Sequence, residues 1–265
     1  MLRIIYVTIT YNAAKVLQRT LDSVLSQDYP HIVHLIIDGA STDDTLLLVD
    51  DYIVRSNAAE NGHLVQVTSE PDKGIYDAMN KGLRSLERLR VGASAGNGDY
   101  VCFLNAGDFL PSSDTVTRIV EKTADQRPAV LYGDTDIVDG EGRFLHHRRL
   151  APPEQLSWKS FRQGMLVCHQ AFYARTDYAI ATPYDLHYRY SADVDWCIRV
   201  MKAAAKENVP LFNLKMVVAC YTQEGQTTLH HRESLLERYH VMEHHYGRLQ
   251  TFFLHCWFAL RSLFK

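Results

Sequence analysis

Two pairs of polar side chains in this sequence stand where a reaction could be carried out. In FLNAGD, Asn105 and Asp108 directly follow the buried-strand pattern of residues 99–104, and in SADVDW, Asp193 and Asp195 open a predicted helix. An aspartate after a core strand can hold Mg²⁺, which is often bound by one or two carboxylates with phosphate oxygens and water. A carboxylate of the second pair can take a proton as a general base. Turn formation by Asn and Gly, and first-turn acids that complement a helix dipole, are the structural alternatives.

Polar residues also follow the first three predicted strands. They are Thr10, Tyr11 and Asn12 after the first strand, Asp38 at the end of the second, and Asp72 and Lys73 after the third. Ligands of open α/β sheets bind beyond the carboxyl ends of the strands. Turn chemistry explains any one of these loops. Four consecutive strand ends at one edge, with FLNAGD as the fourth, predict a polar site with acids, amides and a lysine.

The predicted helix at residues 75–89 carries a polar face close to the same edge. Asp77, Asn80 and Lys81 are three and four residues apart, which places them on one side of the helix. Lys73 and Gly74 precede it, and a helix N-terminus attracts anions. We therefore expect this segment to contact an anionic ligand, with a solvated helix face as the alternative.

Composition limits the class of protein. The 265 residues are 46% hydrophobic and 22% charged, which is typical of a globular protein with a sizeable core. The formal net charge of -3 gives no argument for a nucleic-acid partner. Five cysteines without a CxxC pair predict reduced thiols in a cytoplasmic protein. No uncharged run is long enough for a membrane span. The apolar segment at the start of the sequence is too short, and its end too polar, for a signal peptide.

The elements that must position these residues alternate between strand and helix in the first half. Strands are predicted at residues 3–10, 32–38, 64–68, 100–104 and 129–132, and helices at 13–27, 46–53, 75–89 and 114–122. This alternation predicts an α/β fold with a mainly parallel sheet and helices on both faces. A β-hairpin is expected within residues 134–149. A less regular half follows, with a helix at 192–206, a strand at 211–221 and helices at 229–245 and 248–264.

The motifs together resemble those of family 2 glycosyltransferases. VTITYN, IIDGASTDDT, SEPDKGIYDAMNKG, FLNAGD, CHQAFYAR and SADVDWCIRV occur in that family's order and spacing, over roughly residues 3–225. The string at residues 69–82, with HQAFY downstream, is the most specific part and is most similar to colanic-acid and capsular-polysaccharide transferases. The resemblance implies a Rossmann-like GT-A fold, inversion at the anomeric carbon, a nucleoside-diphosphate-sugar donor and usually a divalent cation, Mg²⁺ or Mn²⁺.

The resemblance also implies a role for each part of the chain. Residues 1–133 would form the nucleotide-sugar half of a domain spanning 1–225, and residues 134–225 its acceptor side. Donor-binding roles fall to Thr10, Tyr11, Asn12, Asp38, Asp72, Lys73, Asp77, Asn80, Lys81 and Asn105. The metal falls to Asp108, the general base to Asp193, and the acceptor and sugar side to His169, Gln170 and Asp195. Asp38 would accept the ring N–H of uracil, which favours a UDP-sugar, with GDP- and dTDP-sugars left open.

Two departures from the family pattern change what we expect of the site. Relatives often carry Asp-Ala-Asp-Asp where this chain has Asn105, Ala106, Gly107 and Asp108, so metal binding without donor should be weak. Relatives also often carry Arg where this chain has Met79. Any contact that this arginine makes with the donor must be made here by Lys73 or Lys81, or be absent. Two other functions remain open, a catalytically idle nucleotide-sugar-binding protein and a sugar-nucleotide nucleotidyltransferase.

The C-terminal segment, residues 226–265, is predicted to add two helices. An apolar stripe at helical spacing runs along the last one through Leu249, Phe252, Phe253, Cys256, Trp257, Leu260 and Phe264. No acid follows Glu243, whereas Arg248, Arg261 and Lys265 add positive charge. This pattern favours a peripheral contact with the inner face of the plasma membrane, where a lipid-linked saccharide acceptor would lie. Packing on the chain's own domain, or in a homodimer, is the alternative. His230 and His231 are a weak further candidate for a metal ligand.

Overall fold

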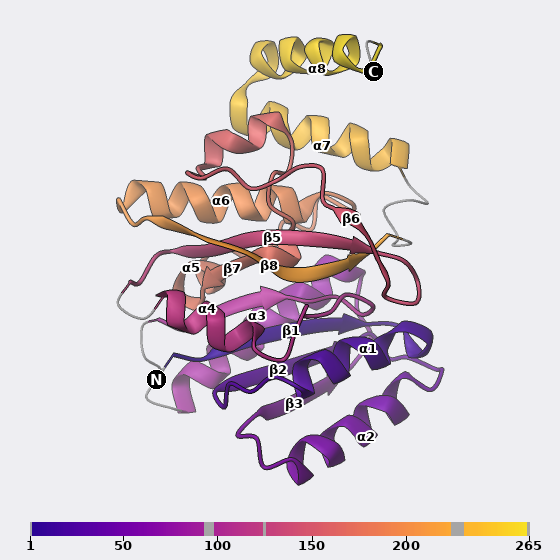
Figure 1. Cartoon of the computed structure of the whole chain (residues 1–265). Coiled ribbons are helices and arrows are strands. Elements are labelled where there is room, and N and C mark those ends of the chain that lie inside the picture. Colours follow the sequence, from indigo (N-terminus) through magenta and orange to yellow (C-terminus); the bar gives the residue numbers. More distant parts are fainter. Residues whose placement is uncertain (1, 93–97, 124–125, 224–230, 264–265) are drawn as a thin grey trace.

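A computed structural model describes residues 2–92, 98–123, 126–223 and 231–263. Over these residues the chain forms an eight-stranded sheet between two layers of helices, and the two C-terminal helices stack above one layer (Figure 1). A cluster of buried hydrophobic side chains runs from Ile4 to Val241. The nucleotide-side and acceptor-side halves expected from the sequence are therefore joined by a shared core.

The strands and helices lie close to their predicted positions. The strands are β1 (Ile4–Thr10), β2 (Ile32–Asp38), β3 (Leu64–Ser69), β4 (Tyr100–Phe103), β5 (Val130–Val138), β6 (Phe144–His147), β7 (Phe172–Arg175) and β8 (Leu211–Thr222). The α-helices are α1 (Ala14–Leu25), α2 (Thr45–Ala58), α3 (Ile75–Gly92), α4 (Thr115–Thr123), α5 (Thr176–Ala181), α6 (Ala192–Lys206), α7 (His231–Tyr246) and α8 (Arg248–Leu263). Two short 3₁₀ helices are η1 (Trp158–Gln163) and η2 (His169–Ala171).

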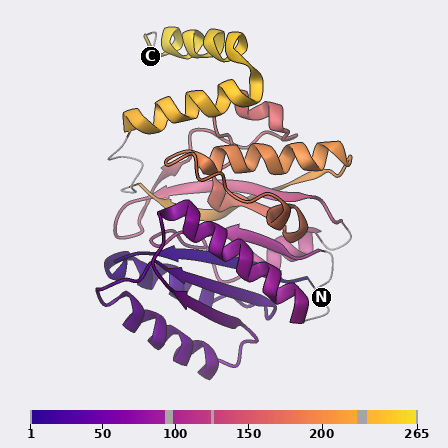
Figure 2. The ribbon, with the colours of Figure 1, turned by 180° about the vertical axis from the view of Figure 1, so that it is seen from behind.

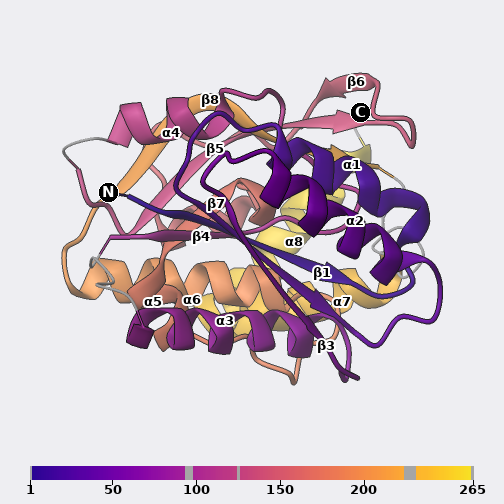
Figure 3. The same ribbon diagram turned by 90° about the horizontal axis from the view of Figure 1, so that it is seen from below.

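The first four strands form the parallel part of the sheet, in the order β3-β2-β1-β4. Every residue of β1, β2 and β4 is buried. Helices cover both faces, with α1, α2 and α4 on one side and α3, α5 and α6 on the other (Figure 3). From behind, α3 crosses the lower half of the sheet with α6 above it (Figure 2). Strands buried on both faces are the reason that these segments are continuous apolar runs. The predicted α/β class is confirmed.

The remainder of the sheet is mixed. β7 lies between β4 and β5 and is antiparallel to both. Because β4 and β5 are each antiparallel to β7, they run in the same direction, and their carboxyl ends share an edge. The predicted hairpin is confirmed as β5 and β6, which pair antiparallel. β8 runs parallel along the other side of β5.

The C-terminal helices extend the layer formed by α6. α7 contacts α6, and α8 contacts α7 and η1. Gly247, with a φ of 86°, separates the two helices, and its lack of a side chain permits this left-handed conformation. Within the described residues, no helix has the length and apolar character needed to cross a membrane.

Candidate functional site

Side chains from four elements meet at the carboxyl edge of β4. The Asn105 side chain Nδ2 lies 3.1 Å from His169 Nε2, and His169 Nδ1 lies 3.2 Å from Asp193 Oδ2. Tyr76, in the first turn of α3, donates its hydroxyl to Asp193 Oδ1 at 3.2 Å. The loop after β4, η2, the first turn of α6 and α3 each supply one of these residues. The sequence predicted three of the four.

The position of Asp193 is fixed by contacts around the start of α6. Glu237, on α7, accepts hydrogen bonds from the backbone N–H groups of Arg189, Tyr190 and Ser191, and so holds the segment that leads into the helix. On the α3 side, the Tyr76 ring stacks on Tyr184 with centroids 5.7 Å apart. Tyr184 in turn stacks on Trp196 of α6 at 5.0 Å. Asp193 is therefore held from both sides by packed elements.

The hydrogen bonds of His169 define the state of Asp193. His169 Nε2 faces the Asn105 amide, and Nδ1 donates its proton to the Asp193 carboxylate. Burial raises the pKa of Asp193, but the hydrogen bond and charge of His169, with the charge of Arg238, outweigh burial and lower it. Asp193 is therefore ionised near neutral pH, as a general base must be.

Asp108 lies in a more enclosed environment. Its Oδ2 accepts a hydrogen bond from Gln170 Nε2 at 2.7 Å, and its Oδ1 accepts one from Thr222 N at 3.1 Å. Burial raises the pKa of Asp108 to about 6, and these hydrogen bonds compensate only in part. In the described part of the chain, no lysine or arginine forms an ion pair with this carboxylate. A buried carboxylate without a cationic partner is a place where a bound cation would be stabilised.

The residues around Asp108 fit a divalent cation that is shared with a ligand. Asn105 Oδ1 is buried and has no hydrogen-bond partner, so this loop offers an amide oxygen as a further ligand. Over the described residues, however, no group of three or more His, Cys, Asp and Glu side chains could enclose a metal ion. Such a thin set of ligands suits Mg²⁺ or Mn²⁺ completed by phosphate oxygens and water, rather than a site built from protein alone.

Asp38 is completely buried at the end of β2, and both of its oxygens are occupied. Oδ1 accepts hydrogen bonds from Thr10 Oγ1 at 2.9 Å and from Ser41 Oγ at 2.5 Å. Oδ2 accepts from Ser41 N at 2.9 Å and from Ser69 Oγ at 2.7 Å. Burial raises the pKa of Asp38, but these four donors outweigh burial and lower it. A role in reading a base stays a prediction, and it requires a serine hydroxyl to turn away.

Tyr11 and Asp72 lie together on the surface above this network. The Tyr11 ring is exposed, and Asp72 Oδ1 accepts a hydrogen bond from Gly74 N at 2.8 Å. A Cβ on Gly39 would lie 2.5 Å from Asp72 Oδ2 and 3.2 Å from Tyr11 Cδ2, so both side chains pack close to the Gly39 backbone. An exposed aromatic ring beside a carboxylate can stack on and hydrogen bond to a planar base.

Asn12 joins two loops of this edge. Its backbone N–H donates to Ser41 Oγ at 2.8 Å, and its side-chain Oδ1 accepts from Thr42 N at 2.9 Å. Asn12 does not cap α1, because the residue directly before the helix is Ala13. Asp43 Oδ2 accepts from Ala14 N at the start of this helix.

The polar face of α3 is engaged mainly with neighbouring loops. Asp77 accepts from Lys73 N at 3.0 Å, and the Lys81 ammonium donates to Pro71 O at 2.6 Å and pairs with the Glu70 carboxylate. Asn80 bonds twice with the backbone of Tyr184, at 2.9 Å to its carbonyl and 2.7 Å from its N–H. The Lys73 side chain is exposed, and no ion pair joins it to a described residue. Lys73 is thus the cation of this segment that is available to an anionic ligand.

The two remaining acceptor-side residues differ in their surroundings. Gln170 is buried between Asp108 and Cys168, whose thiol donates to Gln170 Oε1 at 2.9 Å. Asp195 is buried and binds Arg199 Nε at 2.6 Å and His245 Nε2 at 2.8 Å. Asp195 therefore joins α6 to α7 and does not contact Asp193's partners His169 and Tyr76.

Sequence reasoning missed two residues of the site, Tyr76 and Thr222. Tyr76 belongs to the most specific motif, GIYDAMNKG, and an aromatic residue at the start of a helix with a polar face was the available signal. The structure shows that its ring is buried. Thr222 contributes a backbone N–H, which no residue type reveals. His230 lies outside the described residues, as does the side chain of His231.

Known proteins resemble this chain in sequence and in fold. Residues 6–181 match the family model described as "Glycosyl transferase family 2". A "PGL/p-HBAD biosynthesis glycosyltransferase" of Mycobacterium tuberculosis is 30% identical over 218 residues, which are 82% of this chain and 75% of that protein.

Two solved structures show the same fold at low sequence identity. S. aureus TarS in complex with UDP has a TM-score of 0.63 at 17% identity, covering 91% of this chain and 64% of that one. The mannosyltransferase PcManGT from Pyrobaculum calidifontis, in complex with GDP-Man and Mn²⁺, has a TM-score of 0.61 at 18% identity, covering 89% and 63%. This chain therefore spans a little under two thirds of either. The fold is that of the GT-A glycosyltransferases, and by sequence the chain belongs to glycosyltransferase family 2.

Proposed function

We propose that the protein transfers a sugar from a nucleoside-diphosphate-sugar, a UDP-sugar in the first instance, to a hydroxyl of a saccharide acceptor, with inversion. The observation that carries this proposal is the ionised Asp193 carboxylate, held by His169 and Tyr76 beside the Asp108 loop. Asp193 takes the proton of the acceptor hydroxyl as its oxygen bonds to the anomeric carbon. The bond from that carbon to the diphosphate breaks, and the nucleoside diphosphate leaves.

The leaving diphosphate needs its negative charge neutralised. Asp108 and Asn105 would hold Mg²⁺ or Mn²⁺, and the positive charge of the ion would neutralise the diphosphate. Lys73 lies at the N-terminus of α3, where a cation and the helix dipole both favour an anion. Support for a nucleotide donor comes from the UDP and the GDP-Man with Mn²⁺ named for the two solved structures. Thr10, Tyr11, Asn12, Asp38 and Asp72 would surround the nucleoside.

A thermal-shift screen tests the donor and the metal together. UDP-, GDP- and dTDP-sugars are added with Mg²⁺, with Mn²⁺ or with a chelator, because a ligand bound by the folded state raises the apparent melting temperature. We expect a UDP-sugar with metal to give the largest shift. Release of nucleoside diphosphate in the presence of a saccharide acceptor then separates a transferase from an idle binding protein. No shift with any sugar nucleotide would overturn the proposal.

We further propose that the enzyme is peripheral to the inner face of the plasma membrane and acts on a lipid-linked acceptor in bacterial exopolysaccharide, capsule or O-antigen synthesis. Leu249, Phe252, Phe253 and Trp257 are all exposed on one side of α8, whereas Thr251 on the opposite side is buried. The sequence adds Arg248, Arg261 and Lys265 and no acid after Glu243. An apolar face with net positive charge suits a surface of anionic lipid.

A further inference from the structure

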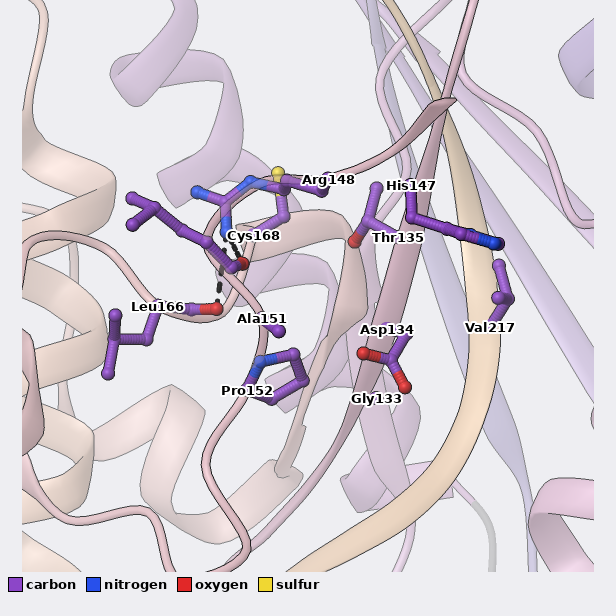
Figure 4. Close-up of a pocket in the computed structure, with 11 residues that line it drawn as sticks. Gly133, Asp134, Thr135, His147, Arg148, Ala151, Pro152, Leu166, Cys168 and Val217 are labelled. Carbon is purple, nitrogen blue, oxygen red and sulfur yellow. Dashed lines mark hydrogen bonds between the residues drawn. The ribbon is translucent and has the colours of Figure 1, made fainter. Parts of the chain in front are cut away.

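A cavity of about 280 Å³ lies beside β5, away from the donor-side strands (Figure 4). Asp134 and Thr135 of β5, Arg148 after β6, Pro152, Leu166 and Cys168 are among the residues that line it. In Figure 4 the Asp134 carboxylate lies across the cavity from Ala151 and Pro152. The volume is near the lower end of small-molecule pockets, about 300 Å³, and suits one ring rather than an extended chain.

The cavity exists because β5 changes partners along one edge. β7 pairs with Val130–Tyr132, and β6 pairs with Asp136–Val138, so the stretch between them faces loops instead of a strand. The register with β8 also shifts on both sides of Asp134. Irregularities of this kind change the direction in which side chains point from a strand. Asp134 and Thr135 are consecutive residues and would point to opposite faces of a regular strand, yet both line the cavity.

Two loops are fixed as walls of the cavity. The Arg148 guanidinium donates to Leu150 O at 2.7 Å, to Met165 O at 2.6 Å and to Leu166 O at 3.2 Å. Its donors are thus directed at backbone carbonyls, and it forms no ion pair with Asp134. Gly133 lets β8 close the cavity from the other side, because a Cβ there would lie 2.6 Å from Met216 O.

Two polar side chains that line the cavity, those of Asp134 and Thr135, are without hydrogen-bond partners among the described residues. Over the described residues, no hydrogen bond or ion pair engages the Asp134 carboxylate or the Thr135 hydroxyl. Leu150, Pro152, Leu166 and Val217 supply apolar surface around them. A carboxylate and a hydroxyl set among apolar walls suit a ring with hydroxyl groups at its edge and C–H groups on its faces. A phosphate would be repelled by the carboxylate, and a single acid is too few ligands for a metal.

The cavity lies on the opposite side of the reaction centre from the donor residues. Cys168, which lines it, donates to Gln170, and Gln170 donates to Asp108. His169, between them in sequence, contacts Asp193. Across the sheet the order is therefore the nucleotide side at β1–β3, the reaction centre after β4, and the cavity at β5.

We propose that this cavity binds one sugar ring of the acceptor, with Asp134 accepting hydrogen bonds from its hydroxyl groups. The inference rests on the proposed glycosyl transfer, and it assigns a residue and a location to acceptor specificity. Hydrogen bonds between a carboxylate and hydroxyl groups are charge-assisted and are each worth about 1.5–3 kcal/mol, so their loss should weaken binding about tenfold or more.

Saturation-transfer NMR with methyl glycosides of glucose, galactose, mannose and N-acetylglucosamine tests this inference, with UDP in the same samples. We expect wild type to bind at least one glycoside, and Asp134→Ala and Asp134→Asn to lose about tenfold or more of that affinity. Glu141→Gln is the matched control, because this exposed acid in the β5–β6 turn pairs with Arg143, and neither residue lines the cavity. The UDP signal should be the same in all variants.

Equal glycoside binding in wild type and Asp134→Ala would overturn the inference. Binding of UDP by wild type with no glycoside binding would overturn it as well, and would leave the proposed transferase function standing. If wild type binds no UDP, the donor proposal fails separately. Melting temperatures close to wild type will show that the Asp134 variants are folded, as expected for a side chain without partners in the protein.

Discussion

His169 Nδ1 lies 3.2 Å from Asp193 Oδ2, and the other nitrogen of the same ring faces Asn105. One imidazole thus spans the distance between the loop that would hold the metal and the carboxylate that would take the acceptor proton. The hydrogen bond from Nδ1 also fixes the plane of the Asp193 carboxylate. Since Tyr76 and the backbone N–H of Val194 hold the other oxygen, the carboxylate has a defined orientation before substrate binds.

Asp193→Asn should abolish the base while keeping the shape of the site. Most of the residues proposed to bind the donor lie near the ends of β1–β3, so affinity for the sugar nucleotide should be nearly unchanged. Transfer to a saccharide acceptor should fall by roughly 10²–10⁴, the range for loss of a positioned general base. Rates of nucleoside-diphosphate release, with donor affinity measured separately, check the prediction. A variant that transfers sugar at the wild-type rate would remove Asp193 from the mechanism.

Asp195→Asn is the matched control two residues away. Asp195 is buried between Arg199 and His245, so the substitution should lower the free energy of unfolding by about 2 kcal/mol. Transfer per folded molecule should remain close to wild type. A folded but inactive Asp195→Asn protein, beside an active Asp193→Asn protein, would mean that the roles of the two carboxylates are reversed.

Asp108→Asn should change how stability depends on pH. In the folded protein burial raises the pKa of Asp108 from 3.8 to about 6, so between these values the folded state binds more protons than the unfolded state. This carboxyl therefore contributes stability at low pH that is lost as pH rises, by about 3 kcal/mol for two pKa units. Relative to wild type, the variant should gain most of this, about 2.4 kcal/mol, between pH 4 and pH 7.

Urea unfolding in a chelator at the two pH values measures this difference. If Asp108 holds the ion as proposed, added Mn²⁺ with a nucleoside diphosphate should stabilise wild type at pH 7 and should have little effect on the variant. Parallel pH profiles for the two proteins would contradict the raised pKa. Equal stabilisation by Mn²⁺ would place the metal elsewhere.

The parallel half of the fold could be predicted because burial on both faces leaves a strong local signal. β1 and β2 are continuous apolar runs, and the helices that cover them have apolar stripes at helical spacing. The place of β7 between β4 and β5 could not be predicted, because four residues carry no information about which strands they will join. The cavity beside β5 results from the same pairing and was invisible for the same reason.

The candidate site was predictable as a set of residues but not as a set of contacts. Asn105, His169 and Asp193 come from separate motifs, and the structure brings them into one hydrogen-bonded chain. Asn80 and Lys81 have the spacing of an exposed helix face, yet both are buried. Helical spacing shows which side chains share a face, and only the tertiary fold shows which loops return to cover it.

Asp38→Asn should weaken binding of UDP more than binding of CDP. Uracil carries a ring N–H that Asp38 could accept, whereas cytosine presents a lone pair at that position. Wild type should therefore prefer UDP, and the variant should lose about tenfold of that preference or more. Calorimetric titration of both nucleotides checks this. An equal loss for UDP and CDP would show that Asp38 acts only by holding Thr10, Ser41 and Ser69 in place. Asp43→Asn, at a carboxylate that binds Ala14 and Thr45 in the loop after β2, is the control.

The outer face of α8 should bind anionic lipid. Replacing Phe252, Phe253 and Trp257 by serine removes three exposed aromatic side chains, so the melting temperature should change little. Wild type should sediment with vesicles that contain phosphatidylglycerol and remain in solution with phosphatidylcholine alone, whereas the triple variant should remain in solution with both. Leu47→Ser is the control, because Leu47 is equally exposed on α2, at the opposite end of the molecule (Figure 1). Two results together would contradict this prediction: wild type sediments with neither kind of vesicle, and it is a dimer that the triple substitution dissociates. The face would then bind a second copy of the chain.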